Sequence, residues 1–134
     1  MIKLLVEKLE EIHFASQATR PNLGIYASEQ EALDGVVARL VAALDPRAIW
    51  LFGSRARGDN RPDSDFDLLV VAKDGCWFGH KGTDGYDEVY APTRGTGVGC
   101  DVIPCDSEHF EVGQLLNTSF VARIVSEGRE VYRA

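Results

Sequence analysis

Apolar residues recur along the chain in two periods, which predict its helices and strands. Apolar positions at steps of three and four predict helices over residues 2–16, 28–44 and 120–127. Short apolar runs bounded by turn residues predict strands over 48–52, 65–71, 101–103 and 130–132. Shorter helices are expected at 86–91 and after Ser107, and glycine-rich loops are expected at 73–85 and 94–99.

The helix over 28–44 and the strand over 65–71 carry the clearest local signals. Ser28 and Glu31 stand at the spacing of a capping box, and Asp45-Pro46 ends the apolar stripe that follows. Because successive strand side chains point to opposite faces, Asp65 and Asp67 are expected to share one face of their strand.

This order of elements predicts an α/β (α+β) fold. We expect a small mixed β-sheet, with helices mainly on one face and with the carboxylates on an exposed edge of the other face. Residues 1–27 are expected to form an N-terminal helical extension, and residues 28–134 a single globular domain. Pro104 is expected to end the third strand.

Composition and charge narrow the partners of the chain. The 134 residues are 45% hydrophobic and 26% charged, a balance typical of a domain with one core. A net charge of -7 argues against a long nucleic acid as the main ligand, because binding to the phosphate backbone needs clustered Lys and Arg. A small nucleotide bound with a metal ion remains compatible with this charge. We see no membrane-spanning stretch and no signal peptide, and therefore expect a cytoplasmic protein.

The three cysteines are expected to be reduced thiols, since their number is odd and no C-x-x-C pair is present. Cys105 and His109 have a spacing that zinc ligands can adopt, but two ligands do not make a zinc site. Trp50 is expected to lie in the core. Trp77 and Phe78, in a glycine-rich loop, are expected to form either a small lid over the site or a contact surface.

One segment carries the chemistry. An apolar strand ends at Gly53-Ser54, and a second strand begins with Ser64-Asp65-Phe66-Asp67. Glycine lets the backbone approach a phosphate closely, and serine adds a hydroxyl at the start of the following helical turn. Two carboxylates two positions apart on a strand can bind hard divalent cations, which prefer oxygen ligands and also bind triphosphate oxygens. Two such ions would serve the attacking and leaving oxygens of a displacement at phosphorus.

The stretch from about residue 48 to residue 71 resembles the G-S-x-x-x-G and S-D-x-D-L signature of the DNA polymerase beta-like nucleotidyltransferases, in particular their minimal (MNT) branch. The resemblance implies a magnesium-dependent enzyme that transfers a nucleoside monophosphate from ATP or another NTP. It implies two Mg²⁺ ions, or Mn²⁺ in their place, bound by Asp65, Asp67 and a third carboxylate on a later strand. Asp101 is the best candidate for this third ligand and for the catalytic base. Asp106 is its rival, but it follows Pro104 and is expected to lie beyond the strand.

The remaining site residues also follow from the resemblance. It implies that Gly53 and Ser54 bind the triphosphate, with Arg55, Arg57 and Ser64 as further nucleotide contacts. In the MNT branch the acceptor commonly belongs to a partner HEPN protein of a toxin–antitoxin pair, so AMP transfer to a hydroxyl of such a partner is an implied activity. Two alternatives stay open. One is an antitoxin-type binding module without catalysis, and the other is an antibiotic-type transfer to a small molecule, for which a homodimer would build the acceptor pocket.

Overall fold

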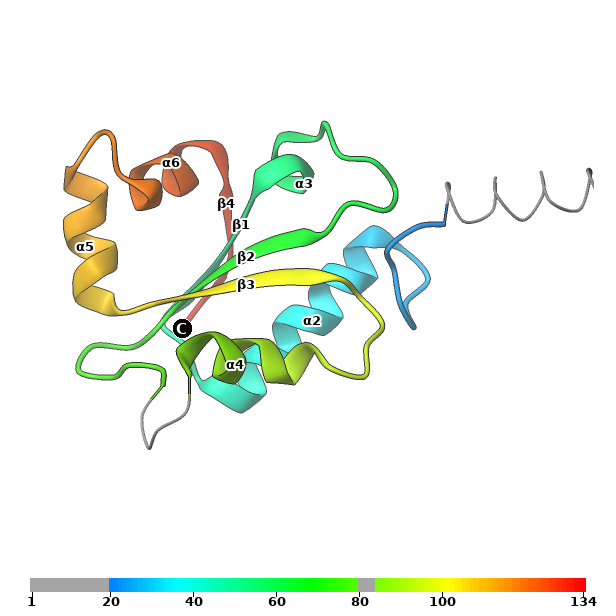
Figure 1. The fold of residues 1–134 in the computed structure, drawn as a ribbon, viewed down its shortest axis with the longest axis horizontal. Helices are drawn as coiled ribbons and strands as arrows, with labels where there is room; N and C mark the ends of the chain where they lie inside the picture. Colours follow the sequence, from blue (N-terminus) through cyan, green and yellow to red (C-terminus); the bar gives the residue numbers. More distant parts are fainter. Residues whose placement is uncertain (1–19, 80–83) are drawn as a thin grey trace, which may run out of the picture.

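A single four-stranded sheet organises the computed structural model, which describes residues 20–79 and 84–134 (Figure 1). The helix predicted over residues 2–16 lies outside these described residues. The strands are β1 (Ala48–Phe52), β2 (Phe66–Val71), β3 (Cys100–Cys105) and β4 (Arg129–Arg133). The helices are α2 (Glu29–Leu44), α3 (Gly53–Arg57), α4 (Gly85–Tyr90), α5 (Ser107–Leu115) and α6 (Phe120–Glu127), with a 3₁₀ turn η1 (Ala91–Thr93).

The sheet has the order β3-β2-β1-β4 and is mixed. β1 pairs antiparallel with both β2 and β4, whereas β2 and β3 run parallel. The connection between the parallel strands contains α4 and η1, as expected for a crossover that must return to the same edge of the sheet. The predicted α+β class with a small mixed sheet is therefore confirmed.

Alternating strand residues divide the core between the two faces of the sheet. On β2, Phe66, Leu68 and Val70 face α2 and α4, whereas Leu69 and Val71 face α5 and α6. Helices therefore pack on both faces. This differs from the predicted arrangement, with helices mainly on one face, because α5 and α6 cover Leu69 and Val71 on the second face. The end of the second face that lies farthest from α5 carries the aspartates discussed below.

The N-terminus of α2 is capped as predicted. The Ser28 hydroxyl accepts a hydrogen bond from the Glu31 amide (3.1 Å). The return bond of the capping box goes to a different donor, since the Glu31 carboxylate accepts from the Ala27 amide (3.2 Å). Asp45 ends the helix in the left-handed region (φ 46°), directly before Pro46.

β3 continues past Pro104 to Cys105, so the prediction that Pro104 ends this strand was wrong. The physical reason is the place of β3 in the sheet. It is an edge strand, and a proline that lacks an N–H is tolerated where no neighbouring strand needs that donor. Asp106 does lie beyond the strand, as expected. It caps α5 by accepting from the His109 amide (2.6 Å), whereas Ser107 is the first residue of that helix.

Residues 20–28 pack onto the domain. Leu23 and Tyr26 contact the core on the α2 side, and the Tyr26 ring lies against Gly35 so closely that a Cβ there would meet it at 2.2 Å. We propose that the domain begins at or before residue 20 rather than at the predicted residue 28. Among the described residues, no helix is both long and apolar enough to cross a membrane.

Candidate functional site

Three aspartates meet at one end of the sheet. Asp67 and Asp101 are register partners across the parallel pair of β2 and β3. Asp65 directly precedes β2 and, by the alternation of strand residues, shares the face of Asp67. Asp65 and Asp101 are exposed and Asp67 is half-buried. The structure therefore brings together the three carboxylates that the sequence analysis selected, and it places Asp106 at the other end of β3.

Two glycines make room for these carboxylates. Gly53 follows Phe52, which pairs with Asp67 across β1 and β2. A Cβ on Gly53 would lie 2.1 Å from Asp67 Oδ2, and the residue has a φ of +72°. A Cβ on Gly99 would lie 2.6 Å from Asp65 Oδ1. Each carboxylate thus lies directly against glycine backbone, and a larger residue at either position would displace it.

The electrostatics of the site reflect this crowding. Partial burial raises the pKa of Asp67, and the charges of Asp101 and Asp65 raise it further, while Arg57 lowers it. Burial, with the charges of Asp65 and Asp67, raises the pKa of the neighbouring Cys100 thiol to about 12. Cys100 is therefore a protonated thiol at neutral pH and not a nucleophile.

None of the three aspartates forms an ion pair within the described part of the chain. Their oxygens are the donors that hard divalent cations prefer. The repulsion among the three carboxylates contributes to the raised pKa of Asp67, and a bound cation would relieve it. In the rotamers present, no three His, Cys, Asp or Glu side chains of residues 20–79 and 84–134 converge tightly enough to enclose an ion. The donor set fits a divalent cation, provided that the exposed Asp65 and Asp101 side chains turn toward Asp67.

Arg55 does not fit the phosphate role predicted for it. Its side chain is only 2% exposed and forms an ion pair with Glu29 (3.2 Å). Its guanidinium donates to the carbonyl oxygens of Pro62 and Ser64 at 2.9–3.0 Å and lies 4.2 Å from the Phe66 ring centre. Every part of the group is therefore occupied within the protein. We propose instead that Arg55 holds the loop that leads into β2.

Asn22, which the sequence analysis did not single out, connects the segments that carry Asp65 and Asp101. Its side-chain amide donates to the carbonyl oxygens of Ser64 and Gly99, both at 2.9 Å. Its side-chain oxygen accepts from the Gly99 amide at 2.6 Å. These bonds span 42 and 77 positions of sequence. An asparagine in a loop next to proline is an ordinary turn residue, so no local signal could have indicated this role.

The other predicted nucleotide contacts lie around the carboxylates. Ser54 is in the first turn of α3, directly after Gly53. Arg57, in the same helix, is half-exposed and forms ion pairs with Asp59 (3.2 Å) and Glu127 (3.7 Å). It is close enough to Asp67 to affect its pKa. The Ser64 hydroxyl accepts from the Arg61 amide (2.9 Å) and so closes the turn before β2.

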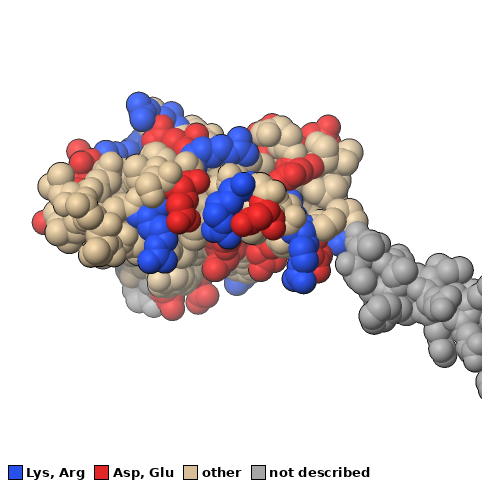
Figure 2. Space-filling view, turned by 90° about the horizontal axis from the view of Figure 1, so that it is seen from above, with Lys and Arg blue, Asp and Glu red and all other residues tan. Residues whose placement is uncertain are grey.

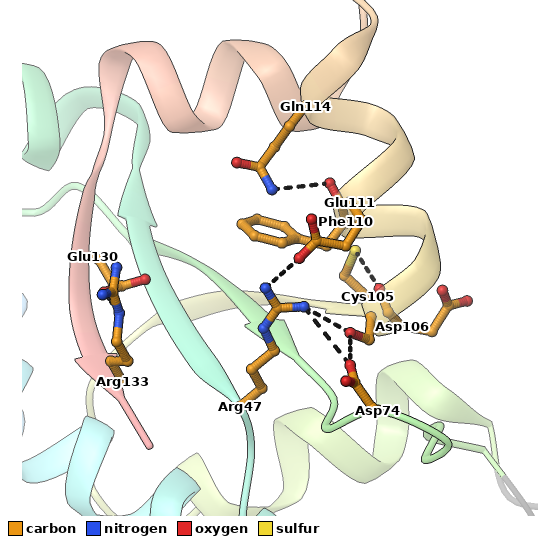
Figure 3. A network of polar contacts seen from close by, with 10 residues as sticks. Arg47, Asp74, Cys105, Asp106, Phe110, Glu111, Gln114, Glu130 and Arg133 are labelled. Atoms are coloured by element: carbon orange, nitrogen blue, oxygen red, sulfur yellow. Dashed lines mark hydrogen bonds and ion pairs between the residues drawn. The ribbon is translucent and has the colours of Figure 1, made fainter.

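A second region is an open hollow of about 800 Å³ between α5 and strands β1 and β4 (Figure 3). Arg47 crosses it, forms ion pairs with Glu111 and Asp74, and donates to the Ser107 hydroxyl at 2.7 Å. Trp50, expected in the core, packs on the α5 side and is half-buried; its Nε1 has no partner among the described residues. We refer to this region as the Arg47 hollow.

The two aromatic residues of the loop before α4 have different surroundings. Phe78 packs against the core on the α2 side, whereas Trp77 is 62% exposed. Phe78 is thus a packing residue, and of the two only Trp77 remains a candidate for the predicted contact surface.

Comparison with known proteins identifies the family. The sequence model of the nucleotidyltransferase domain matches residues 33–131. Comparison with curated proteins gives no match. Among solved structures, the chain is similar to a crystal structure of a toxin–antitoxin with AMP-PNP, at 19% identity and a TM-score of 0.48, covering 74% of this chain and 72% of that one. It is also similar to a candidate nucleotidyltransferase from Sulfolobus solfataricus, at 19% identity and a TM-score of 0.39, covering 82% and 93%.

The two structural similarities are too weak to support a statement about ligand or partner. The family match stands by itself, since it extends over most of the chain and includes Gly53, Ser54 and the three aspartates. The protein therefore belongs to the nucleotidyltransferase domain family and is a nucleotidyltransferase.

Proposed function

We propose that the protein transfers AMP from magnesium-bound ATP to a hydroxyl group of a partner protein. The observation that carries this proposal is the gathering of Asp65, Asp67 and Asp101 beside the Gly53 turn, without an ion pair to any described residue. Like charges held together at a cost to the folded state are typical of sites that bind a cation or a reacting group.

The proposed roles follow from position. Gly53 and Ser54 would receive the triphosphate at the start of α3, and the half-exposed Arg57 would contact its phosphates. Asp65 and Asp67 would hold Mg²⁺, with Asp101 as a further ligand. Bound Mg²⁺ would neutralise phosphate charge and stabilise the leaving pyrophosphate. A bound cation would favour the ionised form of Asp67 and so oppose the rise of its pKa.

Asp101 is proposed as the general base. The acceptor oxygen would attack the α-phosphorus while its proton passes to the Asp101 carboxylate. The bond from the α-phosphorus to the bridging oxygen breaks, and pyrophosphate leaves with the bonding electrons. Such a displacement is in line, so the acceptor enters opposite the leaving pyrophosphate. Because α3 contacts β1 and β2, the acceptor would approach from the side of β3, where Asp101 lies (Figure 1).

A partner protein is the acceptor class we favour. Within this class, the sequence resemblance to the MNT branch implies a HEPN-like toxin as the acceptor. The acidic charge of the chain disfavours a long nucleic acid as the acceptor.

Calorimetric titration of ATP with Mg²⁺ tests the proposed site. We expect the wild-type protein to bind and the variant Asp65→Asn/Asp67→Asn to lose at least about tenfold in affinity, because both metal-binding carboxylates are removed. The matched control is Asp34→Asn/Asp87→Asn, which removes the same charge from exposed positions on α2 and α4. Equal binding by both variants would exclude the carboxylate site. No binding by the wild type would favour the contact-only module.

A further inference from the structure

Four of the eight large apolar side chains that are exposed among the described residues lie on α5, on α6 or in the turn between them: Val112, Leu115, Leu116 and Phe120. Val112 is 49% exposed, Leu116 is 55% exposed and Phe120 is 48% exposed. Large aliphatic and aromatic side chains that gather on one surface, rather than lying singly, mark interaction sites in soluble domains. Figure 2 shows this end of the molecule, at its left, as a stretch with few charged side chains.

These residues line two adjoining hollows. The outer hollow is formed by Val112, Gly113 and Leu116 of α5 and its following turn. The inner hollow, of about 290 Å³, is formed by Leu69 and Ile103 of the sheet, with Phe120 and Tyr86 at its sides. The two hollows share the lining residues Asp106, His109 and Ser119, so they lie side by side on one surface. We call the two together the α5–α6 groove.

The groove leads to the carboxylates. Ile103 and Leu69 form the floor of the inner hollow, and each lies two positions after a carboxylate of the site on the same strand face, Asp101 on β3 and Asp67 on β2. Two positions along a strand correspond to roughly 7 Å. The groove therefore approaches the site from the β3 side, which is the side from which we propose that the acceptor enters.

Charge indicates what kind of molecule would fill this groove. Asp106 and Glu108 lie on its rim, form no ion pair within the described part of the chain, and add to the three aspartates at its inner end. An RNA end or an anionic membrane would be repelled. A protein surface with apolar side chains surrounded by Lys or Arg would be complementary in both polarity and charge.

We infer that the α5–α6 groove is the docking surface for a protein acceptor, whose apolar patch contacts Val112, Leu116 and Phe120 and thereby presents its hydroxyl group to Asp101. This inference rests on the proposed function and deepens it, because it names the surface that selects the acceptor. The surface lies outside the residues proposed to bind nucleotide and metal.

In the test, the purified protein, α-³²P-labelled ATP and Mg²⁺ are added to an extract of the organism that encodes the chain. The molecules that become radiolabelled are then separated. Wild-type protein is expected to label a protein band that protease removes and nuclease leaves intact. The variant Val112→Asp/Leu116→Asp is expected to label this band on the order of tenfold less, because a charged pair replaces the apolar contact. Both side chains are about half-exposed, so the fold should persist, which circular dichroism verifies.

Two further variants sharpen the test. Ile25→Asp changes an apolar residue that is 68% exposed in the loop before α2, a segment that lies at the opposite end of the molecule from α5 (Figure 1), and its labelling should equal that of the wild type. Glu108→Lys should reduce labelling by reversing a charge on the rim.

The outcomes are distinguishable from failure of the proposed function, because Mg²⁺–ATP binding is measured separately by calorimetry. Unchanged labelling by Val112→Asp/Leu116→Asp would overturn the docking surface while the enzyme stands. Label in a nuclease-sensitive or small-molecule product would overturn the protein acceptor. Normal ATP binding together with selective loss of protein labelling would support the inference.

Discussion

Charged side chains are arranged in opposite ways at the Arg47 hollow and at the carboxylate site. In the hollow, Arg47 pairs with Glu111 and Asp74, and lies 5.5 Å from the Phe110 ring centre (Figure 3). At the other end of the sheet, three aspartates lie together, and Arg57, whose charge acts on Asp67, is already paired with Asp59 and Glu127.

This difference distinguishes a region whose ion pairs contribute to stability from a region that we propose binds a ligand. The Arg47 hollow has its charges balanced by its own side chains, so a charged ligand would have to break existing pairs. The three aspartates of the carboxylate site repel one another and have no ion-pair partner in the described part of the chain, an arrangement that favours binding of a cation.

The largest effect should follow from removing the proposed base. Asp101→Asn is expected to lower the rate of transfer by about 10²–10⁴-fold, the usual contribution of a positioned general base. Mg²⁺–ATP affinity should fall far less. The rate is measured as pyrophosphate released in the presence of acceptor. The control Glu111→Gln, in the Arg47 hollow, should transfer at the wild-type rate; a comparable loss there would contradict the division between the two regions.

A smaller effect is expected on stability at the hollow. Arg47→Met should lower the free energy of unfolding by roughly 1–2 kcal/mol, because the hydrogen bond to Ser107 and contacts to two acids are lost while the aliphatic part of the side chain is kept. Urea unfolding measures the change. Mg²⁺–ATP binding should not change, and a variant that keeps its stability but loses nucleotide binding would reverse the assignment.

The smallest expected effect is a gain in stability rather than a loss. The pKa of Asp67 is raised above 3.8 in the folded protein, so the folded state holds this proton more tightly than the unfolded chain does. Stability is therefore lost as the pH rises from below 3.8 through the folded pKa. Without metal, Asp67→Asn should slightly raise the Tm at pH 7 and leave it unchanged well below pH 3.8. Thermal scans at both pH values test this, with the exposed Asp34→Asn as control.

The sequence predicted the parts of the site that depend on local pattern. Gly53-Ser54 and the Asp65/Asp67 pair are recognisable because strand alternation and the turn need only neighbouring residues. Asp101 was placed correctly on a strand although Pro104 suggested an earlier end. The pairing of this strand with β2 could not be deduced from spacing alone.

What the sequence could not show depends on contacts between distant segments. Arg55 stands in the motif next to Ser54, so it was expected at the phosphates, yet Glu29 and the carbonyl oxygens before β2 draw its side chain inward. The packing of α5 and α6 over Leu69 and Val71 likewise arises from which strand faces remain uncovered. Neither outcome has a signature within a short window.

The hydrogen bonds of Asn22 affect the order in which the parts of the site form during folding. A single amide joins the residues that precede β2 and β3, and it comes from a loop 77 positions before Gly99. Contacts of such sequence separation are costly to form, since a long chain segment must close first. We expect the carboxylates to acquire their final spacing only after residues 20–28 have docked. Loosening of that loop would thus separate the segments that carry Asp65 and Asp101, the proposed metal-binding residues, while most of the core stays folded.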